Sequence, residues 1–340
     1  MSIRENVPLR DLTTLRAGGA ARYVIECNDE ASVREALAFA QEKHLPFAVL
    51  GQGSNVLASD SGYEGVVLRM QIQGIVSEEE GDLVTLVAGS GVSWDALVTE
   101  AAQLGLWGIE NLAGIPGTVG AAPVQNIGAY GAEIKETVAW VEVLNSKTGN
   151  IERIQNADCG FGYRDSRFKH EPWLVILRVA FTLSKTASPR IGYSDLAACK
   201  ERGEDLSSPA AIGEAVRKVR SKKFPDLSVS GTAGSFFKNP IVSSEKHAEL
   251  AKRYGAVPSF PVEGGVKIPL AFILDRVLGL KGFAEGNVSL FGNQPLVLVA
   301  EENATAEEID LFATAIANKV HEETGIKIER EVRHFPTKSL

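Results

Sequence analysis

The feature that most constrains how this chain can fold is a glycine-dense stretch between residues 114 and 131. It reads Gly114-Ile115-Pro116-Gly117-Thr118-Val119-Gly120-Ala121-Ala122-Pro123 and, after Val124, Gln125-Asn126-Ile127-Gly128-Ala129-Tyr130-Gly131. Prolines fix φ and glycines permit positive φ, so this backbone is stiff and irregular and leaves many N–H groups without a regular partner. A tight crossing between two lobes is one explanation. Because a long irregular segment inside a compact protein is usually functional, the stretch also suggests a binding loop.

A shorter glycine loop, Gly51-Gln52-Gly53-Ser54-Asn55, directly follows the apolar residues 47–50. Glycines let backbone N–H groups approach an anion closely, and Ser54 and Asn55 add side chains that form hydrogen bonds. The loop is not a Rossmann fingerprint, because Val occupies position 56 and the residues at 59–62 predict a turn instead of a helix. Alone, this loop is weak evidence for phosphate binding.

Two such loops in separate parts of the chain indicate one long diphosphate ligand, and FAD fits that description. Neither loop contains His or Cys, which argues against a covalent link to the cofactor. We therefore expect non-covalent FAD, held by residues of both loops: Gly51, Gln52, Gly53, Ser54, Asn55, Gly114, Ile115, Pro116, Gly117, Thr118, Gly120, Ala121 and Tyr130.

The remaining pattern mixes strands and helices and predicts an α+β or α/β protein of two or three lobes. Strands are expected at 22–26, 47–50, 66–70, 84–88, 140–144, 173–183 and 326–332. Helices are expected after caps at Ser32 and Ser93, after Ser208-Pro209, and after a capping box formed by Thr305 and Glu308. Gly325 ends the last helix.

Length, charge and cysteine usage narrow the class of protein further. A chain of 340 residues is too long for one ordinary core. Its net charge of −8 repels nucleic acid and anionic membranes. Cys27, Cys159 and Cys199 are far apart and predict reduced structural thiols. The first ten residues lack the apolar region of a secretory signal, so we expect a cytoplasmic protein.

Other enzyme classes find no support in the sequence. There is no G-x-S-x-G segment and no Gly-Lys dipeptide, which argues against a hydrolase and a P-loop kinase. The five histidines lack the spacing of metal ligands, so no metal is expected. We also expect no membrane association and no obligate protein partner.

Four further segments carry a family likeness. They are Gly162-Tyr163-Arg164-Asp165-Ser166-Arg167-Phe168-Lys169, Tyr193-Ser194-Asp195-Leu196, Gly234-Ser235-Phe236-Phe237-Lys238-Asn239-Pro240 and Glu331-Val332-Arg333. With the two glycine loops, and in the same order, they resemble the UDP-N-acetylenolpyruvoylglucosamine reductase family, in the subtype that has a tyrosine in its substrate loop. The likeness runs from about residue 12 to residue 333. It departs at Ala20 and Phe272, where the family often has Pro and Trp, and in the segment before Gln294, which lacks a common His.

The resemblance implies a three-lobed FAD-binding fold of the vanillyl-alcohol-oxidase type with a separate substrate-binding lobe. Residues 1–70 and 325–340 would form the first FAD lobe, 71–207 the second, and 208–324 the substrate lobe. It further implies that NADPH supplies the hydride and that a UDP-sugar, UDP-N-acetylglucosamine enolpyruvate, is reduced at its enolpyruvyl group to give UDP-N-acetylmuramate.

The likeness also assigns roles to individual residues. Arg164 would stabilise the negative charge that hydride addition creates, Ser235 would donate the proton, and Glu331 would be their acidic partner. Tyr193, Lys223, Asn239 and Gln294 would contact the substrate. Without the likeness, Arg164 would be expected to pair with Asp165 at the surface, Gly234-Ser235 would be an ordinary turn, Glu331 a solvated carboxylate, and Lys223 part of a basic helix end.

Two other functions remain open at this point. One is a flavin oxidase of a hydroxy acid or sugar with the same fold, which would lack the pair Ser235 and Glu331 and react quickly with oxygen. The other is a non-catalytic nucleotide-sugar binder, which would be purified without flavin.

Overall fold

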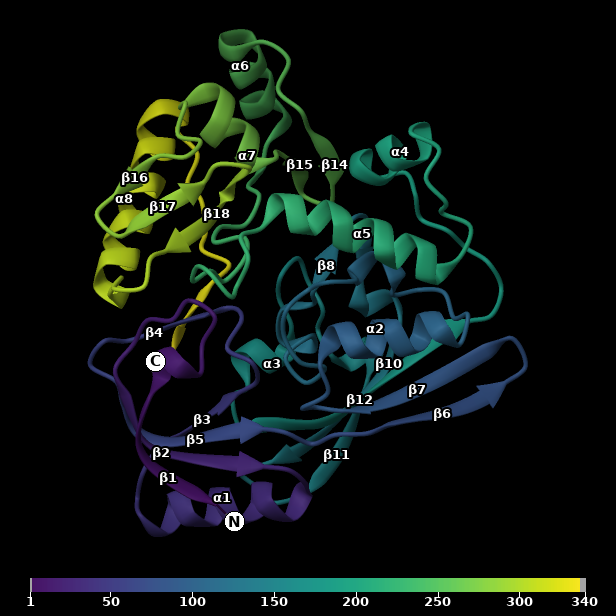
Figure 1. Cartoon of the computed structure of the whole chain (residues 1–340), viewed down its shortest axis with the longest axis vertical. Helices are drawn as coiled ribbons and strands as arrows, with labels where there is room; N and C mark the ends of the chain where they lie inside the picture. The colour runs from purple at the N-terminus through teal and green to yellow at the C-terminus, as the bar shows by residue number, and fades with distance from the viewer. Residues whose placement is uncertain (1, 337–340) are drawn as a thin grey trace. The chain divides into compact units, whose positions relative to one another are not determined.

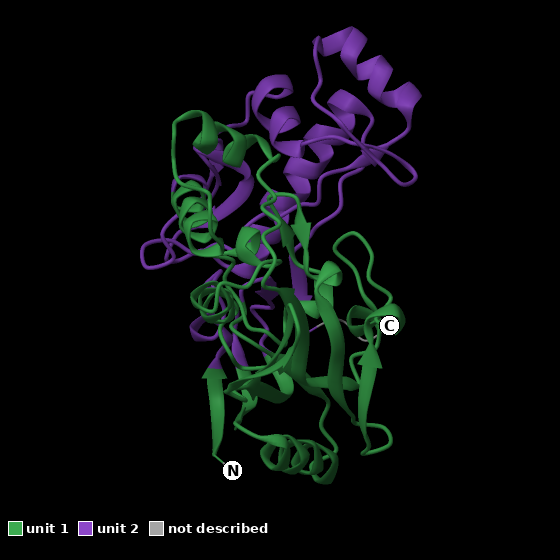
Figure 2. Ribbon diagram, turned by 90° about the vertical axis from the view of Figure 1, so that its right-hand side faces the viewer, with its two compact units in different colours: residues 1–7, 21–53, 63–221 green, residues 8–20, 54–62, 222–340 purple. Residues whose placement is uncertain are grey.

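The computed structural model describes residues 2–336, and these residues form two compact units (Figure 2). Unit 1 holds the residues up to 7, 21–53 and 63–221, and unit 2 holds 8–20, 54–62 and those from 222 onwards. The first glycine loop is divided between them, since Gly53 belongs to unit 1 and Ser54 to unit 2. The division into three lobes remains a proposal.

Unit 1 contains two main sheets (Figure 1). The first has the strand order β1-β2-β5-β3, in which β2 and β3 both run parallel to β5. The second has the order β11-β10-β12-β7-β6 and is antiparallel. The strands are β1 (Ile3–Pro8), β2 (Ala20–Cys27), β3 (Phe47–Leu50), β5 (Tyr63–Met70), β6 (Ile75–Glu80), β7 (Leu83–Gly89), β10 (Val138–Asn145), β11 (Ile151–Gln155) and β12 (Leu174–Ser184), with the short pair β8 (Gly128–Ala129) and β9 (Ala132–Glu133). Six of the seven expected strands are thereby confirmed.

Helix α1 (Glu30–Glu42) lies along the first sheet (Figure 1). Its apolar face buries Val33, Ala36 and Ala40. The expected cap was wrong: Asp29 is the N-cap, and its carboxylate accepts from the Ser32 N–H at 2.8 Å. Ser32 is the third helical residue, and its hydroxyl oxygen accepts in return from the Asp29 N–H at 3.0 Å, so the two residues form a reciprocal capping box.

The second sheet packs against α2 (Trp94–Gln103) and α5 (Pro209–Lys223) in one apolar core. Ser208 caps α5 as expected, accepting from the Ala211 N–H at 3.1 Å. Ile212 and Val216 are fully buried, so most of α5 belongs to unit 1. Short helices complete the unit: α3 (Arg167–His170), α4 (Ser194–Glu201) and 3-10 turns at Glu110–Leu112, Pro123–Gln125, Ile134–Glu136 and Asn156–Asp158.

Unit 2 combines three small sheets with two longer helices. The sheets have the orders β13-β15-β14, β16-β17-β18 and β19-β4. Their strands are β4 (Val56–Ala58), β13 (Ile241–Val242), β14 (Phe260–Val262), β15 (Gly265–Lys267), β16 (Ala284–Glu285), β17 (Val288–Phe291), β18 (Gln294–Ala300) and β19 (Arg333–Phe335), and the helices are a 3-10 turn at Leu9–Asp11, α6 (Ser244–Tyr254), α7 (Leu270–Phe272) with a π-helical turn Ile273–Val277, and α8 (Ala306–Thr324).

Helix α8 agrees with the expectation at both ends. The capping box of Thr305 and Glu308 is present, and Gly325 ends the helix with a left-handed φ of 70°. The Asp60 carboxylate adds a second cap, because it accepts from the Ala306 and Glu307 N–H groups at 2.9 Å each. The bonds to Asp60 connect residues 54–62 to the beginning of α8 within unit 2.

The strand expected at 326–332 was wrong. The strand in this region is β19, which begins at Arg333 and pairs parallel with β4. Residues before it bond to the chain around Phe236 only at single points: the Lys238 N–H donates to Glu329 O and the Glu331 N–H to Phe236 O. Alternating apolar residues predict an extended chain, but the irregular pairing prevents a ladder.

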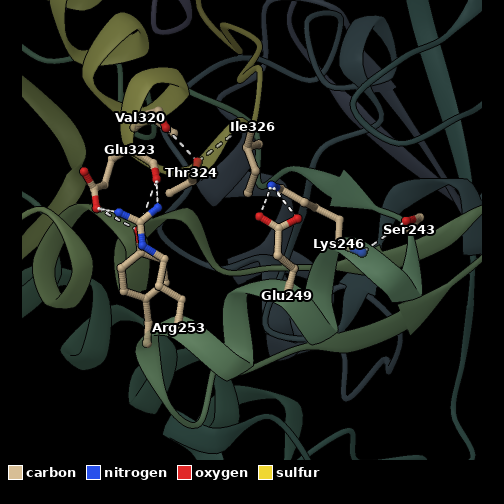
Figure 3. Close-up of polar contacts among 9 residues, drawn as sticks. Ser243, Lys246, Glu249, Arg253, Val320, Glu323, Thr324 and Ile326 are labelled. Carbon is tan, nitrogen blue, oxygen red and sulfur yellow. Dashed lines mark hydrogen bonds and ion pairs between the residues drawn. The ribbon is translucent and has the colours of Figure 1, made fainter.

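Polar side chains join α6 to the C-terminal end of α8 (Figure 3). Arg253 donates to the carbonyl and the carboxylate of Glu323 at 2.9 and 2.7 Å, and the Tyr254 hydroxyl contacts the same two acceptors at 3.1 and 2.7 Å. Lys246 pairs with Glu249 within one turn of α6 at 2.9 Å.

We expect Tyr254→Phe to lower the free energy of unfolding by about 1 kcal/mol, because it removes a hydroxyl that serves two acceptors at a helix end. Glu249→Gln is the matched control and should cost less than about 0.5 kcal/mol, since Glu249 belongs to an exposed pair within one helix. Urea unfolding followed by circular dichroism measures both. Equal losses in the two variants would contradict the contribution of Tyr254.

The three cysteines are buried and unbridged, in agreement with structural thiols. Burial raises the pKa of Cys27 and of Cys159 to about 12, so both thiols stay protonated at neutral pH. Within residues 2–336, no helix combines the length and apolarity needed to cross a membrane. The same residues include no group of three His, Cys, Asp or Glu side chains placed to hold a metal ion.

Candidate active site

The two glycine loops contact each other inside unit 1. The Gly117 N–H donates to the Gln52 side-chain oxygen at 3.0 Å. A Cβ atom at Gly51 would lie 2.6 Å from the Thr118 hydroxyl oxygen, so only glycine allows this approach. This bond joins residues 65 positions apart, so the two loops lie side by side; that they serve one ligand stays a prediction.

Charged side chains from two helices hold the beginning of the second loop. Gly114 has a φ of +69°, its N–H donates to Asp95 Oδ1 of α2 at 2.6 Å, and its carbonyl accepts from Arg220 Nε of α5 at 2.9 Å. Arg217, one turn earlier on α5, pairs with the same Asp95 carboxylate at 3.0 Å. The two main-chain polar groups of Gly114 are therefore both held by side chains of the protein itself.

Buried polar atoms without a protein partner border the second loop. Among residues 2–336 these are the Ser90 hydroxyl and the Asn111 side-chain oxygen. Ser90 packs against Gly120, where a Cβ atom would lie 2.5 Å from that of Ser90, and the Asn111 amide donates to the Tyr130 carbonyl at 2.8 Å. Buried polar atoms normally have partners. A polar ligand beside this loop, such as FAD, fits these residues.

Tyr130 lies at the far end of the second loop and is 8% exposed. Its ring packs edge-on against Tyr193, with 5.4 Å between ring centroids, and its hydroxyl hydrogen-bonds with Arg220. Burial raises the pKa of Tyr130 to about 12, so the phenol is neutral at physiological pH. Tyr193 itself is 42% exposed and directly precedes α4, so it remains accessible for a substrate contact.

The remaining residues assigned to the cofactor lie on the same two loops. Gly53 is buried with a φ of +66°, and the Ala121 N–H donates to the Thr118 carbonyl at 3.0 Å. Ser54 follows Gly53 on the first loop, and Ile115 and Pro116 follow Gly114 on the second. Their part in cofactor binding stays a prediction.

Arg164 is anchored to the second glycine loop. Its Nη2 donates to the Gly128 carbonyl at 2.6 Å, and Nη1 lies 3.9 Å from a Glu133 carboxylate oxygen. Asp165 pairs with His170 at 2.9 Å. The side chain of Arg164 is 17% exposed and its φ is +54°, a backbone strain typical of functional positions.

Ser235 and Glu331 are brought together within unit 2. Ser235 forms an isolated bridge with Val297 of β18, and the next residue donates from Phe236 N–H to Leu296 O at 2.9 Å. The Glu331 N–H donates to the Phe236 carbonyl at 2.8 Å. The residues expected to give the proton and to act as its acidic partner therefore lie on adjacent, hydrogen-bonded segments.

Asn55 connects the end of the first glycine loop to the segment that carries Glu331. Its side-chain amide donates to the Glu331 carbonyl at 3.2 Å, and its own carbonyl accepts from the Arg333 N–H at 3.2 Å. Both contacts lie within unit 2. A residue assigned to the cofactor loop is thus also a neighbour of a catalytic candidate.

Tyr193 belongs to unit 1, and the other three expected substrate contacts lie in unit 2. Lys223 ends α5 and is half-buried, and the preceding Lys222 carbonyl accepts from Asn293 at 2.9 Å. Gln294 directly follows Asn293 and begins β18. Asn239 uses its side-chain oxygen within the protein, accepting from the N–H of the first α7 residue at 2.9 Å, so its amide group is what a ligand could contact.

Several contributors were missed by the sequence analysis. Asp95, Arg217 and Arg220 hold Gly114, and Asn293 holds the end of α5. The three-residue spacing of the two arginines places them on one helix face, which was the available signal. Asp95 offered none, because an acidic residue in a first helical turn is ordinary.

Comparison with known proteins gives a consistent result over the whole chain. Residues 21–155 match the model of an FAD binding domain, and residues 226–335 match the UDP-N-acetylenolpyruvoylglucosamine reductase C-terminal domain. UDP-N-acetylenolpyruvoylglucosamine reductase of Pseudoalteromonas atlantica is 40% identical over 333 residues, which cover 96% of this chain and 94% of the relative. That of Pseudomonas syringae pv. tomato is 38% identical over 336 residues, 97% of this chain and 98% of the relative.

A solved structure agrees with the sequence relatives. The crystal structure of UDP-N-acetylenolpyruvylglucosamine reductase from Thermus caldophilus aligns with a TM-score of 0.69 at 25% identity, covering 98% of this chain and 100% of that one. The α+β fold with an FAD-binding part of the expected type is confirmed by this match and by the FAD-binding domain model.

Proposed function

The chain belongs to the family of UDP-N-acetylenolpyruvoylglucosamine reductases, and we propose on this basis that it is an FAD-dependent oxidoreductase of peptidoglycan precursor synthesis. It reduces the enolpyruvyl group of UDP-N-acetylglucosamine enolpyruvate to UDP-N-acetylmuramate, with NADPH as the hydride source. The observation that carries this function is identity of about 40% along nearly the full length of chain and relative.

The two glycine loops of unit 1 are the proposed FAD site. FAD, when bound, supplies hydride transfer between NADPH and the substrate. Gly51 and Gly120 let the loops pack closely against Thr118 and Ser90, because a Cβ atom at either position would clash there. The N–H groups of the loops suit the diphosphate, and the unpartnered Ser90 and Asn111 atoms suit polar groups of the cofactor.

Arg164, Ser235 and Glu331 are the proposed catalytic residues. Hydride addition to the enolpyruvyl double bond leaves negative charge on the carbon that bears the carboxylate. A guanidinium stabilises that charge, and Arg164 is held in place for the task by the Gly128 carbonyl. Ser235 then gives its proton to the carbon, with Glu331 on the adjacent segment as the acidic partner.

The proposed substrate contacts are Tyr193, Lys223, Asn239 and Gln294. Lys223 suits the diphosphate of the UDP-sugar because an ammonium group favours a negative ligand. We propose a cytoplasmic enzyme that needs no obligate protein partner, nucleic acid or membrane. The acidic net charge of −8 supports the exclusion of nucleic acid and of anionic membranes.

A visible spectrum of the purified protein tests the function against its two rivals. We expect a yellow flavin band that bleaches anaerobically with NADPH and returns when UDP-N-acetylglucosamine enolpyruvate is added. A colourless protein that cannot take up FAD would instead support a nucleotide-sugar binder. A band that returns quickly with oxygen but not with the enolpyruvyl compound would support an oxidase.

A further inference from the structure

Thr232 lies three residues before Ser235 and is held on several sides. It is 4% exposed. Its hydroxyl donates to the Leu298 carbonyl of β18 at 2.7 Å, and its main-chain N–H donates to Thr14 O at 2.9 Å. A hydroxyl has one proton to donate, and here Leu298 receives it. The Thr232 oxygen is then left as an acceptor.

That acceptor is used by the turn that carries Ser235. The Gly234 N–H donates to Thr232 Oγ1 at 3.2 Å. Gly234 has a φ of +75°, so the chain makes a left-handed step immediately before Ser235. A Cβ atom there would meet only the Phe224 ring, at 3.9 Å, so the surroundings leave this step loosely packed. The bond to Thr232 therefore orders a turn that packing alone does not.

The other side of Ser235 is fixed by β18 and by the segment of Glu331. Phe236 donates from its N–H to Leu296 and accepts at its carbonyl from Glu331. The chain is thus held on both sides of Ser235: before it by the bond from Gly234 to the Thr232 side chain, and after it by the main-chain bond from Phe236 to Leu296. Both sides are connected to β18, because Thr232 donates to the Leu298 carbonyl and Phe236 donates to the Leu296 carbonyl.

We propose that Thr232 is a positioning residue for Ser235. Its hydroxyl, bonded to Leu298 and Gly234, sets the turn from which the Ser235 side chain emerges. The proposal rests on the proposed role of Ser235 as proton donor. Serine is a weak acid, so the rate of proton transfer depends closely on its placement, and a displacement of about 1 Å costs roughly 100-fold.

A purely structural role for Thr232 makes different predictions. Loss of the hydroxyl would leave two buried polar groups without a partner, which lowers stability whatever Ser235 does. Stability alone would affect FAD content and both half-reactions together. A positioning role affects the half-reaction that needs the proton and spares the one that does not.

The test compares Thr232→Val, which keeps the shape, with Thr232→Ser, which keeps the hydroxyl. Each FAD-loaded variant is reduced anaerobically with NADPH in a stopped-flow instrument and then mixed with UDP-N-acetylglucosamine enolpyruvate. For Thr232→Val we expect bleaching within about twofold of wild type and reoxidation slower by roughly 10- to 100-fold. The solvent deuterium effect on reoxidation should rise, because proton transfer becomes limiting. Thr232→Ser should restore both values.

Three results would overturn the proposal: unchanged reoxidation in Thr232→Val, equal slowing of both half-reactions, or failure of Thr232→Ser to restore the rate. If Thr232→Val does not fold, Thr232→Ala is measured in its place, and if neither folds while Thr232→Ser does, the hydroxyl serves folding and the positioning role is wrong. Ser235→Ala, run in parallel, separates the two hypotheses: normal turnover in that variant removes the proton-donor assignment itself, independently of Thr232.

Discussion

Replacing Ser235 with alanine leaves the bleaching of the flavin band by NADPH at the wild-type rate and slows its return with the enolpyruvyl substrate by about 10²- to 10⁴-fold, the usual contribution of a positioned general acid. NADPH reduces the cofactor without needing a proton from Ser235. The substrate, in contrast, gains both a hydride and a proton, and only the second comes from the serine.

The position of Ser235 makes this variant informative. Its main chain is held by Thr232 before it and by β18 after it, so removal of one hydroxyl should leave the turn in place. Glu331 remains on the adjacent segment. The loss in rate can then be assigned to the missing proton donor instead of a displaced backbone.

The control is Ser230→Ala, in the loop that precedes this segment. The Ser230 N–H bonds to the Asp226 carbonyl, and the residue lies outside the proposed catalytic set. Stopped-flow traces of both half-reactions should match wild type in this control. Normal reoxidation in Ser235→Ala would remove the serine from the mechanism and leave the proton to another group.

Local sequence signals predicted the parts of this fold in which one segment carries all the information. Helix α8 is the clearest case, because its capping box, its apolar stripe and the terminal Gly325 all lie within about twenty consecutive residues. The cap of α1 was placed three residues late, because Ser32 and Asp29 are both good capping residues and the reciprocal bond uses both. Local patterns seldom fix an element boundary more closely.

The site depended on contacts that no local pattern records. Residue types and glycine density indicated two ligand loops, and these do meet at Gln52 and Gly117. The bond from Asn55 to Glu331 joins residues that are 276 positions apart in the sequence. The bond from Arg217 to Asp95 joins residues that are 122 positions apart. The sequence analysis did not single out Thr232. Such anchors follow from the tertiary fold, so only the structure could reveal them.

Replacing Gly120 with alanine should abolish or strongly reduce the amount of FAD that the purified protein carries. A Cβ atom at position 120 would lie 2.5 Å from the Ser90 Cβ and 3.1 Å from the Ser90 main-chain Cα and oxygen. A Cβ atom does not approach another carbon to 2.5 Å, so either the loop or the chain at Ser90 must move. Overpacking of this kind costs about 1–3 kcal/mol.

The second loop has little freedom to move away. The Gly120 N–H donates to the Ser90 carbonyl at 3.0 Å, the Val119 N–H to Val92 O at 2.9 Å, and the Trp94 N–H to Gly117 O at 3.0 Å. Relief of the clash must therefore break bonds that give the loop its shape. Because these residues form the proposed cofactor site, the distortion should appear as lost FAD affinity, by at least about tenfold if 1.4 kcal/mol of the cost falls on binding.

The double variant Gly120→Ala with Ser90→Gly distinguishes packing at this contact from a general effect of alanine. It removes the closest atom, at 2.5 Å, but also the Ser90 hydroxyl proposed to face the cofactor, and it leaves the two main-chain contacts at 3.1 Å. For both reasons we expect only partial recovery of FAD binding. Gly292→Ala is the control, because a Cβ atom there meets nothing within 4 Å and the residue has no positive φ. FAD content from the visible spectrum and the dissociation constant from flavin fluorescence measure all three proteins. Full FAD binding in Gly120→Ala would mean that the cofactor does not depend on the close contact between this loop and Ser90.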